Sequence, residues 1–319
     1  MSSPTTAGTA ARVAVLIPCR DEAQTIGGVV RAFRDALPEA AVYVYDNGST
    51  DSTGALAREA GATVRAEPRR GKGYVIRAMF RDVEADVYVL VDGDGTYPAE
   101  RVRELIRPVL EGTADMVIGS RLHRDSRSQF HAVNRLGNRL FRGVINAIFR
   151  VQVTDLLSGY RAFHRRVVKG LPFLSHGFES ETELTVKCLV RGYRIEEIPI
   201  DLLPRPAGSR SKIRVVQDGV LILNTIIALF RDYKPLTAFG LVGVSLIALG
   251  LVPGFMVIRE FLETGLILRL PSALLAVGLV LCGLLVAFTG LVLHTITRRF
   301  QELDDQLQRL IESRGERRA

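Results

Sequence analysis

Short runs of apolar residues alternate with segments of helical periodicity through the first two thirds of the chain. The apolar runs are four or five residues long and are typical of buried strands; they are Val13–Ile17, Val42–Tyr45, Val87–Val91 and Met116–Gly119. The segments between them are expected to form helices over Glu22–Phe33, Ser52–Glu59, Tyr74–Val83 and Glu100–Leu110. This alternation predicts an α/β fold with a Rossmann-like, mostly parallel sheet that helices cover on both faces.

Two long stretches toward the C-terminal end contain no Asp, Glu, Lys or Arg: Leu236–Ile258 and Pro271–Thr297. Each exceeds the roughly 20 residues that an α-helix needs to cross a bilayer. A purely soluble protein is therefore excluded, and the pattern predicts two transmembrane helices that make the protein integral to the cell membrane.

The charges around these stretches predict their orientation. The connection Arg259–Leu270 carries charges that cancel, whereas Arg231, Lys234, Arg298 and Arg299 flank the outer ends of the spans. The positive-inside rule then places the α/β domain and both termini in the cytoplasm, with a short external hairpin. The first apolar run is too short and wrongly flanked for a signal peptide, which agrees with a cytoplasmic N-terminal part.

The chain therefore divides into five expected parts. These are a disordered tail over 1–11, the α/β domain over 12–210, a juxtamembrane interfacial helix over 211–234, a two-helix transmembrane hairpin over 235–299, and a cytoplasmic C-terminal helix or tail over 300–319. The amphipathic segment Phe130–Val151 either lies in the membrane interface or packs on the domain core. The stripe of Phe300, Leu303, Leu307 and Leu310 suits either self-association into a homo-oligomer or a solvated tail.

The net charge and the cysteine content of the chain indicate which partners and which structural cross-links to expect. The chain has 319 residues, and 42 Lys and Arg against 34 Asp and Glu give a net charge of +8. Basic residues beside membrane spans are expected to face anionic lipid head groups, so a nucleic-acid partner is not predicted. The three cysteines are scattered and offer neither a disulfide framework nor a zinc spacing.

Two carboxylates follow directly after the predicted strand Val87–Val91, in Asp92-Gly93-Asp94. Paired hard oxygen ligands at a strand end can share Mg²⁺ or Mn²⁺ with a diphosphate. No histidine stands at a zinc-ligand spacing with them. The simpler interpretation, an Asp-Gly turn, stays open for the motif alone, but its position after a buried strand favours a metal site.

Polar clusters also follow the first two predicted strands. Pro18-Cys19-Arg20-Asp21-Glu22 follows the first strand and Tyr45-Asp46-Asn47-Gly48-Ser49-Thr50-Asp51 the second. Ligands of such sheets lie beyond the carboxyl ends of the strands, so Asp46 is a candidate to bind a base or ribose. Asp51 or Ser52 is expected to cap the next helix. Neither G-x-G-x-x-G nor a P-loop is present; Gly71-Lys72-Gly73 has a different context.

In combination, these motifs resemble those of the inverting family 2 glycosyltransferases of GT-A fold. Further matches, Ser158-Gly159-Tyr160-Arg161, Gly177-Phe178-Glu179 and Arg205 with Ser211-Lys212, resemble the polyprenyl-phosphate glycosyltransferases, the group that contains dolichyl-phosphate mannose synthase. The resemblance covers about residues 12–230. The paired C-terminal spans are similar to those of bacterial and archaeal members.

The resemblance implies a role for each matching position. The implied nucleotide-sugar site comprises Pro18, Arg20, Glu22, Asp46, Lys72, Asp92, Gly93, Asp94 and Arg121. The metal, Mg²⁺ or Mn²⁺, is expected on Asp92, Asp94 and Thr96, which stands where many members carry Gln. The acceptor phosphate is expected to meet Arg121, Arg205, Ser211 and Lys212.

The implied reaction is transfer of a hexosyl group from a nucleotide-sugar to a polyprenyl phosphate of undecaprenyl or dolichyl type. A UDP-sugar is the favoured donor, and GDP-mannose is compatible. The expected catalytic residues are Asp92, Asp94, Asp155 and Arg205, with Asp155 either orienting a neighbour or acting as a base. The acceptor is already anionic, so little general base catalysis is needed. Glu179, Glu181 and Glu183 are expected only to line a helix start.

Three other functions share some of these features. Processive polysaccharide synthases have the paired aspartates and membrane spans, but they use a Q-x-x-R-W motif and this chain has no Trp. A catalytically silent nucleotide-sugar-binding membrane scaffold stays open, as does a glycosyltransferase with a different lipid acceptor. Metal-dependent hydrolysis of the donor would separate an enzyme from a scaffold.

Overall fold

The computed structural model describes residues 11–121, 143, 146, 153–173, 177, 179–204 and 215–316. The chain forms two compact units, Met1–Ile226 and Ile227–Ala319, each described by itself. The predicted amphipathic segment Phe130–Val151 lies almost wholly outside the described residues.

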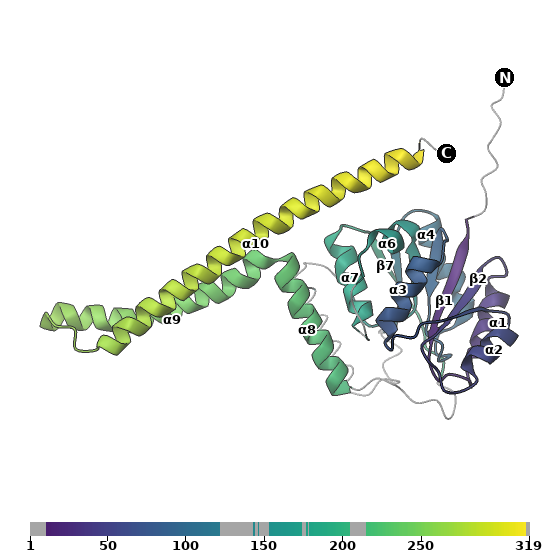
Figure 1. Ribbon diagram of the computed structural model, residues 1–319, viewed down its shortest axis with the longest axis horizontal. Helices are drawn as coiled ribbons and strands as arrows, with labels where there is room; N and C mark the ends of the chain where they lie inside the picture. Colours follow the sequence, from purple (N-terminus) through teal and green to yellow (C-terminus); the bar gives the residue numbers. More distant parts are fainter. Residues whose placement is uncertain are drawn as a thin grey trace, which may run out of the picture. The chain divides into compact units, whose positions relative to one another are not determined.

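The first unit is built on a seven-stranded sheet with the order β3-β2-β1-β4-β6-β5-β7 (Figure 1). Its strands are β1 (Val13–Cys19), β2 (Ala41–Asp46), β3 (Thr63–Ala66), β4 (Val87–Leu90), β5 (Met116–Ser120), β6 (Arg161–His164) and β7 (Ile195–Pro199). Strand β6 runs antiparallel to its neighbours β4 and β5, and the other pairs are parallel. The predicted mostly parallel α/β sheet is confirmed.

Helices connect the strands and cover both faces of the sheet. They are α1 (Ile26–Ala36), α2 (Thr53–Glu59), α3 (Lys72–Asp82), the 3₁₀ turn η1 (Ala99–Arg101), α4 (Val102–Leu110), α6 (Arg165–Gly170) and α7 (Ser180–Val190). One face joins Val15 and Val89 with Phe33 of α1 and Leu105 of α4 in a single buried cluster. On the other face, Phe80 of α3 stacks edge-on against Tyr88 and Phe163. Strands covered on both faces read as continuous apolar runs, which is why the sequence revealed β1 and β4.

Several boundaries differ from the predicted ones. The first helix begins at Ile26 rather than at Glu22, because residues 20–25 form a loop in which Glu22 O accepts hydrogen bonds from Thr25 N and Ile26 N. The third helix begins at Lys72, two residues before the predicted start. Strands β3, β6 and β7 were not predicted: β3 and β7 are edge strands in which every residue is at least partly exposed, and β6 begins at a charged residue, Arg161.

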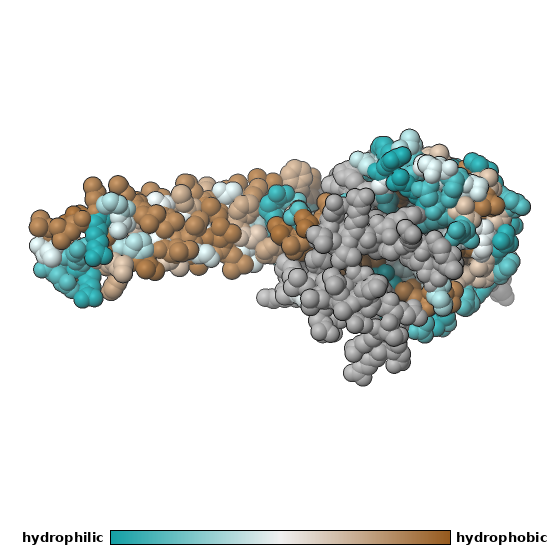
Figure 2. Space-filling model, turned by 90° about the horizontal axis from the view of Figure 1, so that it is seen from below, coloured by the Kyte–Doolittle hydropathy of each residue, from teal (hydrophilic) through white to brown (hydrophobic). Residues whose placement is uncertain are grey.

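The second unit contains the predicted pair of long apolar helices. Helix α8 (Val215–Tyr233) leads into it, followed by α9 (Pro235–Thr264) and α10 (Leu270–Glu316). Pro235–Thr264 and Leu270–Leu303 are long and apolar enough to cross a membrane, and Figure 2 shows that most of their visible surface is apolar. Helices α9 and α10 pack antiparallel, since Gly243 lies against Gly283 while Gly290 lies against Pro235 and Phe239.

Candidate active site

Three loops meet at the carboxyl ends of the neighbouring strands β2, β1 and β4. The Asp21 N–H donates to Ser49 Oγ at 2.9 Å, and the Thr50 N–H donates back to Asp21 Oδ1 at 2.7 Å. The Thr25 hydroxyl of the first loop donates to the carbonyl of Gly93 at 2.7 Å. The polar clusters that the sequence places after separate strands therefore form one continuous site.

The loop after β2 is held by Asp51 and Asn47. Asp51 accepts hydrogen bonds from the backbone N–H groups of Ala23 (3.2 Å) and Thr53 (3.0 Å). Burial would raise the pKa of Asp51, but these bonds and one from the Thr53 hydroxyl lower it overall. Ser52 occupies the N-cap position of α2 without a side-chain hydrogen bond. Of the two residues expected to cap this helix, Asp51 is the one that accepts from its first N–H, that of Thr53.

Asn47 is a structural residue that sequence reasoning did not single out. It is buried, and its amide donates to the carbonyls of Glu67 (3.0 Å) and Arg69 (2.7 Å). Its side-chain oxygen accepts from the Gly71 N–H at 2.8 Å. These bonds join the end of β2 to the turn before Lys72. Asn in a turn after a strand was the only available signal.

Asp46 lies at the end of β2, half-buried beside this loop. Its Oδ1 accepts hydrogen bonds from the Ser49 N–H at 2.9 Å and the Ser49 hydroxyl at 2.5 Å. Its Oδ2 lies beside Gly54, where an added Cβ would lie 3.2 Å from it. The carboxylate is thus oriented by its own loop, as a binding residue at a strand end needs to be.

Asp92 and Asp94 lie on the turn that follows β4. Asp94 Oδ1 accepts from the Thr96 N–H at 3.1 Å and from the Thr96 hydroxyl at 2.7 Å, so Thr96 orients this carboxylate. Gly95 has a φ of +73°, which glycine tolerates best. The Asp-Gly turn and the paired carboxylates are therefore one feature, because the turn presents both side chains to the site.

The residues around the pair suit a hard divalent cation. A Cβ at Gly159 would overlap the Asp92 carboxylate, and a Cβ at Gly93 would displace the carboxylate of Glu22. Within the part of the chain that the structure describes, no group of three or more His, Cys, Asp or Glu side chains is placed to hold a metal. Two carboxylates completed by phosphate oxygens and water are a common environment for Mg²⁺. The donor set therefore fits Mg²⁺ or Mn²⁺ bound together with a diphosphate.

Lys72 lies between two carboxylates from different elements. Its ammonium is 2.5 Å from Asp92 Oδ1 and 2.5 Å from Glu181 Oε1, and its side chain is only 13% exposed. Burial alone would lower the pKa of Lys72, but the charges of Asp92 and Glu181 outweigh it and hold the pKa above its ordinary value. Lys72 is therefore a permanent cation next to the paired aspartates.

Two acidic residues of α7, which were expected only to line the helix start, form buried ion pairs. Glu181 and Glu183 do lie in the first turn, but both are 3% exposed. Glu181 pairs with Lys72, and Glu183 is 2.5 Å from Lys187. Sequence reasoning missed Glu181 because its partner lies on α3, far away along the chain.

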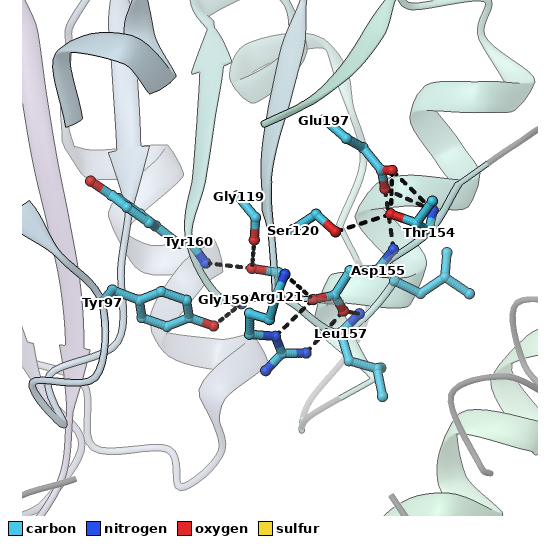
Figure 3. Close-up of polar contacts among 12 residues, drawn as sticks. Tyr97, Gly119, Ser120, Arg121, Thr154, Asp155, Leu157, Gly159, Tyr160 and Glu197 are labelled. Carbon is cyan, nitrogen blue, oxygen red and sulfur yellow. Dashed lines mark hydrogen bonds and ion pairs between the residues drawn. The ribbon is translucent and has the colours of Figure 1, made fainter. Parts of the chain in front are cut away.

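Arg121 and Asp155 form an ion pair in which the carboxylate is fully buried (Figure 3). The Arg121 Nε and a terminal nitrogen donate to the two carboxylate oxygens at 2.8 and 2.9 Å, and the Arg121 backbone N–H adds a third bond at 3.0 Å. Burial would raise the pKa of Asp155, but the charge and hydrogen bonds of Arg121 lower it overall. A fully buried carboxylate held in this way orients Arg121 and is a poor proton acceptor.

The loop that carries Asp155 is itself held in place. Glu197 of β7 accepts from the Thr154 and Asp155 N–H groups, and the Tyr97 hydroxyl accepts from the Gly159 N–H at 2.9 Å (Figure 3). Beneath it, the fully buried Arg161 donates to the carbonyls of Leu156 and Ser158 and to the Thr185 hydroxyl. Arg161 of the Ser158-Gly159-Tyr160-Arg161 motif thus fixes the backbone of the loop that carries Asp155.

The remaining expected site residues fall into two groups. Arg205, Ser211 and Lys212 lie outside the described residues. Pro18 and Arg20 lie at the end of β1 and in the loop after it, on the same edge of the sheet as Asp46 and Asp92. The structure thus gathers Glu22, Asp46, Lys72, the paired aspartates, Thr96, Arg121 and Asp155 at one edge of the sheet.

The amino-acid sequence matches one protein family and several characterised relatives. The family described as glycosyl transferase family 2 matches residues 14–171. Glycosyltransferase AglJ of Haloferax volcanii is 33% identical over 299 residues, which cover 92% of this chain and 98% of that relative. A dolichyl-phosphate hexose transferase of the same organism is 28% identical, over 67% of this chain and 92% of its own. An undecaprenyl-phosphate mannosyltransferase of Micrococcus luteus is 29% identical, and the match covers 62% of this chain and 86% of that relative.

Solved structures share the fold of the first unit. Glucosyl-3-phosphoglycerate synthase of Mycobacterium tuberculosis superposes with a TM-score of 0.58 at 22% identity, covering 69% of this chain and 81% of that one. The same enzyme crystallised with Mn²⁺, UDP-glucose and phosphoglyceric acid gives a TM-score of 0.59 at 22% identity. This match covers 69% of this chain and 80% of that one. The likeness is one of architecture: a mostly parallel mixed sheet of GT-A type with helices on both faces.

Proposed function

Since this chain belongs to glycosyl transferase family 2, it is a glycosyltransferase, and we propose that it moves a hexosyl group from a nucleotide-sugar to a polyprenyl phosphate. Two relatives named for dolichyl-phosphate and undecaprenyl-phosphate transfer support this acceptor. The two helices long and apolar enough to span a membrane support a lipid acceptor as well. We propose the cytoplasmic face as the place of reaction, with both termini on that side.

The observation that carries the proposal is the paired carboxylate turn at the carboxyl edge of the sheet. Asp94 is oriented by Thr96, and Gly159 leaves room for the carboxylate of Asp92. We propose that the two aspartates hold Mg²⁺ or Mn²⁺, which would offset the negative charge that develops on the leaving nucleoside diphosphate. The fold neighbour crystallised with Mn²⁺ and UDP-glucose supports this choice of ion and a UDP-sugar as favoured donor.

Around this centre we assign binding roles by position. Pro18, Arg20, Glu22 and Asp46 line the edge on which the nucleotide is expected, and Gly93 and Lys72 lie beside the diphosphate position. Arg121 presents a planar guanidinium suited to a phosphate, and Asp155 fixes its orientation. Arg205, Ser211 and Lys212 complete the proposed acceptor-phosphate site.

The proposed reaction is a single displacement. An oxygen of the lipid phosphate attacks the anomeric carbon from the face opposite the diphosphate; the new bond forms as the bond to the diphosphate breaks, and the configuration inverts. A phosphate monoester has a second pKa of about 6 and is largely dianionic at neutral pH, so no proton needs to be removed. Asp155 with its lowered pKa therefore serves as an orienting residue rather than a base.

The test is a transfer assay with the full chain, polyprenyl phosphate, a panel of nucleotide-sugars and Mn²⁺, with the glycolipid product identified by mass. Asp94→Asn should lower kcat by at least about 100-fold, because it removes one of two carboxylates that hold the cation. The matched control is Asp86→Asn, since Asp86 precedes β4 at the opposite edge of the sheet, and it should keep normal turnover.

Three results would contradict the proposal in different ways. Near-normal transfer by Asp94→Asn would remove the metal assignment. Nucleotide-sugar binding with neither glycolipid formation nor donor hydrolysis would favour a silent scaffold instead. Transfer only to a lipid without a phosphate would identify a different lipid acceptor.

A further inference from the structure

Glu181 of α7 is buried, and its carboxylate is linked to the proposed metal ligand Asp92 through Lys72. Its Oε1 lies 2.5 Å from the Lys72 ammonium, on whose other side Asp92 Oδ1 lies at 2.5 Å. Its Oε2 accepts a hydrogen bond from the Ser180 hydroxyl at 3.0 Å. The carboxylate of Glu181 is therefore directed at Lys72.

This geometry creates a competition for Asp92. A lysine paired with Asp92 alone would form a neutral pair and reduce the attraction of that carboxylate for a divalent cation. With Glu181 included, the set of one ammonium and two carboxylates keeps a net charge of −1. The charge of Asp92 is then still available to a cation.

Because Lys72 is largely buried, it needs Glu181 as a second anionic partner. The Lys72 side chain is 13% exposed and that of Glu181 is 4% exposed. If Asp92 turned from Lys72 to a cation with no other anion present, a buried ammonium would be left without a counter-charge, which is costly. With Glu181 in contact, Lys72 keeps a partner throughout the exchange and stays beside the diphosphate position.

We propose that Glu181 is a positioning residue that retains Lys72 and so frees Asp92 to bind the divalent cation. This inference rests on the proposed function, because it takes Asp92 and Asp94 as the metal ligands. It assigns a role to α7, which supplies neither of the two proposed ligands, and it makes metal affinity depend on a carboxylate that acts through Lys72.

The test measures Mn²⁺ binding to the full chain in detergent with UDP present, from the electron paramagnetic resonance signal of free Mn²⁺. Glu181→Gln should raise the Kd for Mn²⁺ by about tenfold, the usual scale for losing a residue that supports a metal ligand. The matched control is Glu183→Gln: Glu183 lies on the same helix, is equally buried and is ion-paired with Lys187, and its substitution should change the Kd less than about twofold.

Removing Lys72, which competes with the cation for Asp92, distinguishes the proposed role of Glu181 from a purely structural one. Both Lys72 variants are compared with the unmodified chain without UDP, because Lys72 itself lies beside the proposed diphosphate position. Under these conditions the double variant Lys72→Met with Glu181→Gln should bind Mn²⁺ within about threefold of the unmodified chain, because no ammonium then neutralises Asp92. Lys72→Met alone should bind Mn²⁺ at least as tightly as the unmodified chain, and this variant tests the proposal even if Glu181→Gln fails to fold.

The outcomes are distinguishable. The inference is overturned if Glu181→Gln binds Mn²⁺ normally, or if, without UDP, the double variant stays as weak as Glu181→Gln or Lys72→Met loses affinity. If the unmodified chain binds no Mn²⁺ with UDP, or if Asp94→Asn leaves binding unchanged, the metal assignment of the proposed function fails and the inference fails with it.

Discussion

The Arg121–Asp155 pair depends on the shape of both side chains. Asp155 is fully buried, and its two oxygens receive two parallel hydrogen bonds from one guanidinium. Lysine could not reproduce this planar, two-point contact. Because removing one member leaves the other charge buried and unpaired, the pair is a fixed element of the site and not an adjustable one.

His164 provides a residue-level prediction on pH. It is the N-cap of α6, where its Nδ1 accepts a hydrogen bond from the Arg166 N–H at 3.1 Å, and only the neutral ring can do so. Burial and the charge of Arg166 lower the pKa of His164 below its ordinary value of 6.5. The unfolded chain therefore takes up the proton first as the pH falls. This contribution to stability is complete above about pH 6.5 and is lost as the pH falls toward the lower pKa of the folded state.

The corresponding measurement is the melting temperature of the full chain in detergent between pH 7.5 and 5. His164→Ala should lower the melting temperature at pH 7.5 by about 3 °C, the effect of losing a helix cap in a domain of this size. His164→Asn keeps an acceptor that does not titrate, so it should lose less stability than the unmodified chain between pH 7 and 5. Equal pH dependence of the two chains would contradict this role of His164.

At the scale of elements, small residues set the distance between α9 and α10. A Cβ added at Gly243 would lie 2.7 Å from the Gly283 carbonyl oxygen, and one at Gly283 equally close to that of Gly243. Gly250 and Gly290 make similar approaches one heptad further along each helix, to Ala276 and to Pro235 and Phe239. Such close backbone approach is a usual way for helices to associate within lipid.

Gly283→Leu should therefore push the two helices apart and lower the melting temperature of the full chain in detergent by several degrees, since the obstruction is backbone and cannot move aside. Gly278→Leu is the matched control: it lies on the same helix with no atom within 4 Å of an added Cβ. That substitution should leave the melting temperature unchanged or slightly raised, because leucine is the better helix former. Equal effects of the two substitutions would contradict this packing.

At the scale of the whole molecule, the first unit carries the proposed chemistry and the second the proposed membrane anchor. Residues Met1–Ile226 form a compact unit of their own, whereas the two long apolar helices belong to the rest of the chain. Anchoring an enzyme in the membrane that contains its substrate raises the effective concentration of the two partners.

A chain that ends at Lys234 should therefore keep its affinity for the nucleotide-sugar but transfer at least about tenfold more slowly to long-chain polyprenyl phosphate in vesicles. A short, water-soluble prenyl phosphate should serve both chains equally, which controls for damage to the site. The lipid-phosphate proposal would be wrong if the shortened chain glycosylated a water-soluble alcohol as well as the full chain glycosylates the lipid.

The sequence by itself determined those features that local pattern encodes. Strands such as β1 and β4 are buried on both faces and so read as apolar runs, and the two apolar stretches are long enough to identify candidate spans without any tertiary information. The motifs that follow the strands, Asp92-Gly93-Asp94 among them, indicated the family in combination, because each is a short run of residue types next to one another in the chain.

Only the tertiary structure decided the contacts that join distant parts of the chain. The pairing of Lys72 with Glu181, of Arg121 with Asp155 and of Gly159 with Asp92 each links residues on separate elements. The same holds for the antiparallel β6 between β4 and β5. Such contacts leave no periodicity in the sequence, since they depend on which strand ends and helices the fold brings to the same edge of the sheet.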